Sequence, residues 1–129
     1  MVNIEKHIAH WRTGAEEDFE VAGQLIKSNK IRHGLFFLHL TIEKILKAHV
    51  CRHTGDIAPR IHNLVRLAEL SGVVFDPEQL DLLSEMNPCN IEGRYPELWG
   101  ALPSQQEAEM LANKTEDVLK CLKNQLNNQ

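Results

Sequence analysis

The sequence contains little cysteine, few aromatic residues and no excess of positive charge. Its three cysteines are an odd number, and no two of them form a Cys-x-x-Cys pair. Because this pattern gives neither a disulfide framework nor a zinc site, we expect reduced thiols in a cytoplasmic protein. The net charge of −4 argues against non-specific DNA binding, since proteins that coat a polyanion are basic.

Several other signals are absent from the sequence. It has no Gly-rich phosphate loop, no Ser or Cys nucleophile motif and no set of four ligands at zinc spacing. It also has no secretory signal core and no run of apolar residues suited to crossing a membrane. We therefore expect no metal site and no membrane association. These absences indicate no cofactor, and a nucleotide is suggested only by the residue types of the irregular stretch 89–103.

The chain does contain helical periodicity along most of its length. It shows no repeat and no alternating strand pattern, and its 129 residues with 43% hydrophobic content suit one domain, 1–129. The sequence therefore predicts an all-α protein, an antiparallel up-and-down bundle of four to five helices. The expected helices cover residues 4–28, 31–53, 60–71 and 76–87, and a last helix begins at residue 104.

The stretch 31–53 is predicted to be the central, buried helix. Its apolar residues recur every three or four positions, and a second apolar row covers much of the remaining surface. The first row is Ile31, Leu35, Leu38, Ile42 and Ile45, and the second is Phe36, Leu40 and Val50. In the fourth predicted helix, the same spacing argument predicts that Leu80, Leu83 and Met86 are buried.

One line of polar residues interrupts the apolar surface of the central helix. His39, Glu43 and Lys47 are each four positions apart, so they lie close to one face. Buried charges need partners, and two interpretations remain open. Lys47 contacts a phosphate together with His39, or Glu43 and Lys47 form a structural ion pair that locks the helices or a dimer.

The longest irregular stretch, residues 89–103, contains a second set of candidate residues. Arg94 and Tyr95 offer a planar cation for phosphate and a ring for base stacking. The alternative is that both residues only anchor the loop. His62 lies near the start of the third predicted helix, where a helix N-terminus attracts anions, although such a histidine is also an ordinary cap or surface residue.

Four segments together resemble the HEPN family (higher eukaryotes and prokaryotes nucleotide-binding domain). The stretch WRTGAEEDFEVAGQLI is similar to that family's Trp-x-x-x-Ala-Glu-x-Asp-Leu opening, and LHLTIEKILKAHV to its Ala-x-Glu-Lys-x-Leu-Lys-Ala centre. Arg60 to Leu64 (RIHNL) resembles the family's His-x-Leu start of helix three, and Glu92 to Pro96 (EGRYP) its Ala-Arg-Tyr-Pro loop. The segments occur in the family's order and cover most of the chain.

This resemblance implies an all-helical bundle that pairs as a homodimer, with one of two activities. Many small members resemble the helical partner of a minimal nucleotidyltransferase, often in toxin–antitoxin pairs. Others are RNA endonucleases that carry Arg, four to six residues, and then His near the later helices. No histidine follows His62 here, so Arg94 has no such partner. The spacing does occur from Arg32 to His39, but not at the family's catalytic place.

The leading hypothesis is therefore a dimeric nucleotide-binding module that acts with a nucleotidyltransferase partner, without catalytic residues of its own. A metal-independent RNA endonuclease and a structural dimerisation module without ligand are the alternatives. For the first hypothesis, the candidate nucleotide-binding residues are Arg94, Tyr95, Lys47, His39, Glu43 and His62.

Overall fold

The computed structural model describes residues 3–91 and 102–127, and these ranges are helical along most of their length. No strand occurs within them, which confirms the predicted all-α class. The elements are α1 (Ile4–Lys27), α2 (Ile31–Thr54), α3 (Leu64–Ser71), α4 (Pro77–Met86), the 3-10 helix η1 (Asn87–Ile91) and α5 (Gln105–Asn127).

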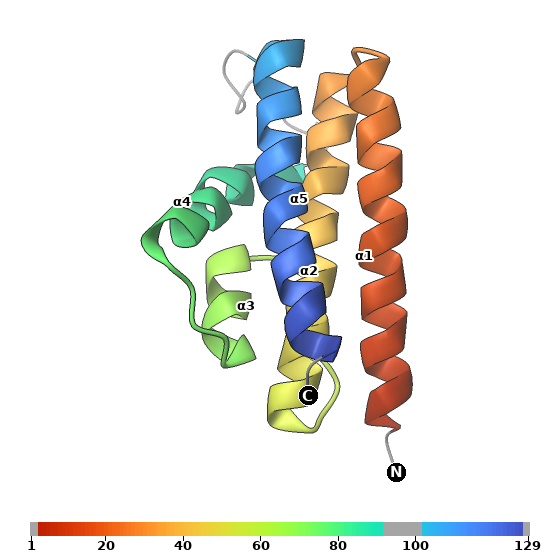
Figure 1. Ribbon diagram of the computed structural model, residues 1–129, viewed down its shortest axis with the longest axis vertical. Helices are drawn as coiled ribbons and strands as arrows, with labels where there is room; N and C mark the ends of the chain where they lie inside the picture. Colours follow the sequence, from red (N-terminus) through yellow and green to blue (C-terminus); the bar gives the residue numbers. More distant parts are fainter. Residues whose placement is uncertain (1–2, 92–101, 128–129) are drawn as a thin grey trace.

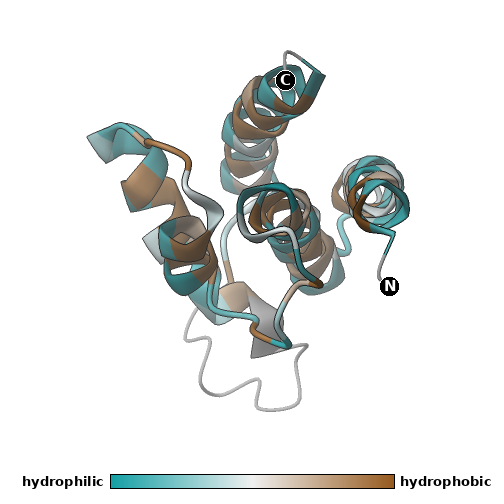
Figure 2. Ribbon diagram, turned by 90° about the horizontal axis from the view of Figure 1, so that it is seen from below, coloured by the Kyte–Doolittle hydropathy of each residue, from teal (hydrophilic) through white to brown (hydrophobic). Residues whose placement is uncertain are grey.

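The three long helices pack side by side, and α2 lies at the centre of the bundle (Figures 1 and 2). α1 and α2 are antiparallel and joined by a tight turn at Asn29, whose φ is 60°. α5 runs antiparallel to α1, because Gln105 at its start hydrogen-bonds the carbonyls of Ile26 and Lys27. α5 is therefore parallel to α2. Between these two helices, α3, α4 and η1 return the chain along α2, on the side away from α1 (Figure 1).

Local capping interactions explain where the helices begin. The Asn3 side chain accepts a hydrogen bond from the Lys6 N–H, at 3.1 Å. The stretch DPEQ at residues 76–79 has the residue types and spacing of a capping box, and α4 opens with one. The Gln79 N–H donates to the Asp76 side chain, and the Asp76 N–H donates to the Gln79 side chain. The corresponding reciprocal pair before α5 joins Ser104 and Glu107.

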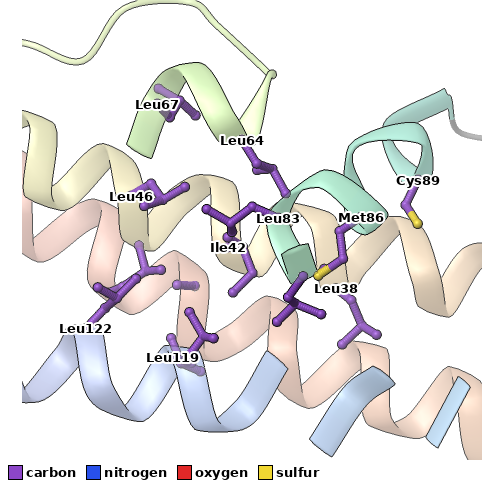
Figure 3. Packing of buried hydrophobic residues seen from close by; sticks show 14 of the residues in the cluster. Leu38, Ile42, Leu46, Leu64, Leu67, Leu83, Met86, Cys89, Leu119 and Leu122 are labelled. Atoms are coloured by element: carbon purple, nitrogen blue, oxygen red, sulfur yellow. The ribbon is translucent and has the colours of Figure 1, made fainter. Parts of the chain in front are cut away.

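The predicted burial of α2 is confirmed. Its apolar side chains project in several directions into the core, toward α1, α5 and the α3–α4 side (Figure 3). Brown, apolar segments face inward in the view along the bundle (Figure 2). The side chains that are less than 2% exposed include Leu35, Leu38, Ile42, Ile45 and Leu46 of α2, with Leu64, Leu67, Leu83, Met86 and Leu122 around them.

The third helix is shorter than the sequence predicted. It begins at Leu64 rather than near residue 60, because Asn63 takes an extended conformation and caps it. The Asn63 side-chain oxygen accepts from the Arg66 N–H at 3.0 Å, and the Asn87 side chain accepts from the Leu64 N–H at 2.7 Å. This second contact comes from 23 residues away, so the start of α3 is fixed partly by η1.

The buried side of α4 also differs from the prediction in one residue. Leu80 is 41% exposed, whereas Leu82 is only 5% exposed. Leu82 therefore fills the buried position predicted for Leu80. Leu83 and Met86 are fully buried, as predicted. Apolar residues at 80, 82 and 83 allow two neighbouring helix faces, and only packing against α2, α3 and α5 selects the face that contains Leu82.

Candidate functional site

Four of the predicted site residues come together around one carboxylate, and we call them the Glu43 cluster: His39, Glu43, Lys47 and His62. The Lys47 Nζ donates to Glu43 Oε2 at 3.0 Å. The other carboxylate oxygen, Oε1, is 3.1 Å from His62 Nδ1 and 3.6 Å from His39 Nδ1. Three members come from successive turns of α2, and His62 comes from the segment just before α3.

The ion pair at the centre of this cluster is shielded from solvent. The side chains of Glu43 and Lys47 are only 6% and 7% exposed. The Lys47 Nζ also lies 5.1 Å from the centroid of the Trp11 ring on α1, within the range of a cation–π interaction. A buried carboxylate and ammonium are tolerated because each satisfies the other, and Trp11 adds favourable contact to the cation.

His39 is the most deeply buried member of the cluster. Its side chain is fully buried, and within the described residues neither ring nitrogen has a hydrogen-bond partner. Burial lowers the pKa of His39 from 6.5 to about 4, and the Glu43 carboxylate only partly opposes this shift. The imidazole is therefore neutral at pH 7 and contributes packing and a dipole rather than charge.

His62 is the one member that reaches the surface, with a side chain that is 65% exposed. Its Nδ1–H donates to Glu43, which fixes the ring orientation. With Nδ1 engaged in this way, the neutral ring presents the Nε2 lone pair to solvent, and the protonated ring presents an N–H there. A histidine oriented by a carboxylate can thus accept a proton, or it can donate a hydrogen bond to an anion.

The described residues include only these four of the six predicted nucleotide-binding residues. Arg94 and Tyr95 lie outside the described residues. The sequence had placed His39, Glu43 and Lys47 on one helical face, but it had not predicted that His62 bonds Glu43 or that Trp11 covers Lys47. Both contacts join segments that are distant in the sequence, and no residue spacing reports them.

Metal sites and membrane-spanning helices are both absent from the described residues. No group of three His, Cys, Asp or Glu side chains in residues 3–91 and 102–127 is arranged to hold a metal ion. Of the helices in the same ranges, none combines the length and the apolar character needed to traverse a bilayer.

Comparison with known proteins identifies the family. The sequence model of the HEPN domain matches residues 8–125. The chain belongs to the HEPN domain family. No curated protein sequence matches this HEPN chain.

Two solved structures share the fold of this HEPN chain. The crystal structure of TT1696 from Thermus thermophilus superposes with a TM-score of 0.77 at 16% identity, covering 91% of this chain and 96% of that one. The crystal structure of ST0689, an archaeal HEPN homologue, gives a TM-score of 0.69 at 22% identity, covering 97% and 98%. At these identities the likeness establishes the helical arrangement and not a shared ligand.

Removing the cation of the buried ion pair should destabilise the protein strongly. We expect Lys47→Met to lower the free energy of unfolding by about 3–5 kcal/mol, because it leaves the buried Glu43 carboxylate without its counter-ion. The double variant Glu43→Gln with Lys47→Met should recover much of that loss. Urea unfolding followed by circular dichroism measures both changes.

Lys120→Met is the matched control for this experiment. Lys120 is paired with Glu116 at 3.9 Å, but their side chains are 67% and 42% exposed. Its loss should change the unfolding free energy by no more than about 0.5 kcal/mol. Equal effects at Lys47 and Lys120 would contradict the assignment of a buried, stabilising pair.

His39 should make stability depend on pH in a defined window. Its pKa is about 4 in the folded protein and 6.5 in the unfolded chain, so the unfolded chain binds more protons between these values. Stability is therefore complete above pH 6.5 and falls as the pH drops toward 4, by roughly 3 kcal/mol for this group. His39→Leu should reduce that slope, and the part that remains includes the contribution of the buried His49, whose pKa is also lowered by burial.

The exposed His33 supplies the control for the pH experiment. His33→Leu should leave the pH dependence of the parent unchanged, because His33 is exposed and lies outside the Glu43 cluster. Chemical denaturation at a series of pH values between 4 and 7.5 gives the three slopes. A His39→Leu slope identical to that of the parent would show that His39 is not the titrating group.

Proposed function

We propose that this HEPN protein is a dimeric nucleotide-binding module that acts with a minimal nucleotidyltransferase partner, as in toxin–antitoxin pairs. The single observation that supports a ligand site is the exposed His62, held in a fixed orientation by the buried Glu43. The HEPN resemblance implies both the pairing of two copies and the partner enzyme. In this proposal the chain binds and presents a ligand and does not itself catalyse a reaction.

In its protonated form, His62 donates a hydrogen bond from Nε2–H to a phosphate oxygen, while Nδ1–H donates to Glu43. Glu43 and Lys47 then act as the rigid support for His62, because their own charges are already paired and shielded. Arg94 and Tyr95 are proposed to complete the site, on the basis of residue type: a cation for phosphate and a ring for the base.

A dimer is proposed because the HEPN resemblance implies one and because α2 retains apolar surface. Phe36 and Leu40 are only half-buried, and Phe36 stacks edge-to-face on Phe37 with ring centroids 5.7 Å apart. An apolar edge on an otherwise covered helix suits contact with the same edge of a second copy.

Nucleotide binding is tested by a thermal-shift screen of ATP, GTP and AMP, on protein whose dimeric mass is first established by light scattering. We expect at least one nucleotide to raise the melting temperature. His62→Ala should weaken its binding about tenfold, and Arg94→Ala about tenfold to a hundredfold, as expected for hydrogen bonds to a charged phosphate.

His33→Ala is the control, because His33 is exposed on α2 but is not a member of the Glu43 cluster. It should bind nucleotide as the parent does. If none of the three nucleotides changes the melting temperature, the nucleotide-binding proposal is wrong. If binding survives both His62→Ala and Arg94→Ala, the ligand binds elsewhere.

The same histidine favours a second candidate function, metal-independent RNA cleavage. A carboxylate-oriented imidazole is suited to removing the proton from a ribose 2′-hydroxyl as that oxygen attacks phosphorus and the bond to the 5′ oxygen breaks. The transition state also needs positive charge beside the phosphate. Lys47 is buried against Glu43 and cannot supply it, so we rank this function second.

We accordingly expect little or no cleavage of single-stranded RNA in the presence of EDTA. The measurement is gel analysis of a labelled RNA, with the parent, His62→Ala and His33→Ala proteins purified identically. Rapid cleavage by the parent and by His33→Ala, together with its loss in His62→Ala, would replace the binding proposal with the nuclease.

A further inference from the structure

A second polar site lies on a different side of α2 from the Glu43 cluster. A pocket of about 550 Å³ opens between the last turns of α2, the end of α3 and the last third of α5. Its polar lining residues include His49, Arg52, His53, Ser71 and Gln125. Cavities that hold small ligands commonly measure about 300–1,000 Å³, so this pocket is large enough for one.

The lining of this pocket carries positive charge in a protein that is acidic overall. Arg52 is a permanent cation, and two histidines stand beside it. Among its lining residues, all in the described part of the chain, none is Asp or Glu. The chain has a net charge of −4, so a pocket that holds the Arg52 cation and no carboxylate in its lining differs from the protein as a whole and favours an anion.

Arg52 has unused hydrogen-bonding capacity. The only carboxylate near its guanidinium in the described residues is Glu5, whose Oε2 is 3.9 Å from Nη2. Glu5 is itself 81% exposed, so this contact is a weak surface pair. The Arg52 Nε is buried and has no hydrogen-bond partner within those residues. A buried N–H without an acceptor is rare in folded proteins and calls for a specific explanation.

His53 is held against the pocket by a glycine. Gly72 has a φ of 74°, and a Cβ at this position would collide with the His53 ring. That ring therefore packs directly on the backbone that follows α3, at the rim of the pocket. His49 has a different role, because its Nε2 is 2.8 Å from the Leu122 carbonyl oxygen and burial lowers its pKa. It forms a neutral wall.

The position of Arg52 and His53 in the last turn of α2 offers a simpler explanation, since cations there complement the helix dipole. Other groups already satisfy carbonyls in this turn, however. The Gly55 N–H donates to the Cys51 carbonyl at 2.9 Å, and the Thr54 hydroxyl donates to the Val50 carbonyl at 2.8 Å. Dipole complementarity also does not account for the unpartnered Arg52 Nε.

We propose that this pocket binds a small phosphorylated molecule, with the phosphate held between Arg52 and His53. The guanidinium offers paired N–H donors that match phosphate oxygens, and the His53 ring and the Gln125 amide add further donors. The pocket exceeds the size of a phosphate ion and leaves room for the organic part of a phosphate monoester. The site does not depend on the nucleotide proposal, because Lys47 faces α1 whereas His49 faces α5.

The test is titration of the full chain with inorganic phosphate and, separately, glycerol phosphate, in a phosphate-free buffer. Calorimetry gives affinity, and ¹H–¹⁵N spectra of the arginine Nε–H groups report the contact. We expect a selective shift of the Arg52 Nε–H resonance. Tighter binding of glycerol phosphate would identify a monoester ligand, and equal affinity a free phosphate ion. Both outcomes support the phosphate site.

Arg52→Gln should weaken phosphate binding at least about tenfold, as expected for losing a charge-assisted hydrogen bond. Arg66→Gln is the matched control, because Arg66 is an exposed arginine already paired with Glu69, and it should bind as the parent does. If Arg52→Gln does not fold, His53→Gln tests the same pocket from an exposed position. No shift at Arg52, or equal binding by the parent and a folded pocket variant, would overturn the proposal.

His62→Ala separates this site from the proposed nucleotide site. This variant should bind phosphate at Arg52 as the parent does, even if its affinity for a nucleotide is lower. Loss of phosphate binding in His62→Ala, with Arg52→Gln unaffected, would assign the phosphate to the Glu43 cluster and overturn the proposal.

Discussion

A helix that is apolar on nearly every side has to be covered on nearly every side, and α2 imposes this requirement on the whole protein. α1 covers one side along its length, α5 covers a second, and α3, α4 and η1 cover a third. The short helices follow from the same constraint. Because α5 runs parallel to α2, the chain has to return along α2 first, and the α3–α4 segment does this while adding Leu64, Leu67 and Leu83 to the core.

Charged residues on such a helix either pair with each other in the core or reach the surface. α2 contains both arrangements, and each contributes to one candidate site. In the middle of α2, Glu43 and Lys47 are buried and neutralise each other, and Glu43 accepts an orienting hydrogen bond from the exposed His62. At the end of α2, Arg52 and His53 leave the core and enter an open pocket. In the first case the charge is satisfied within the protein. In the second, the Arg52 side chain brings positive charge to the lining of the pocket.

Most of the fold could be predicted from the sequence, because each long helix has an apolar stripe and readable ends. The spacing of Ile42 and Ile45 indicated α2, and the Asp76 capping box indicated the start of α4. The errors occurred where a local signal was ambiguous. Residues 80, 82 and 83 permit two buried faces, and Ile61 stands at helical spacing from Leu64 although Asn63 caps the helix between them.

The sequence by itself determined the features set within a few residues: the helices, their caps and the placement of Glu43 and Lys47 on one helical face. These depend on backbone periodicity, which a spacing reports directly. Only the tertiary structure decided that His62 bonds Glu43, that Trp11 covers Lys47, and that Arg52 and His53 share a pocket with Gln125. Those contacts join separate segments, and their geometry follows from how the helices pack around α2.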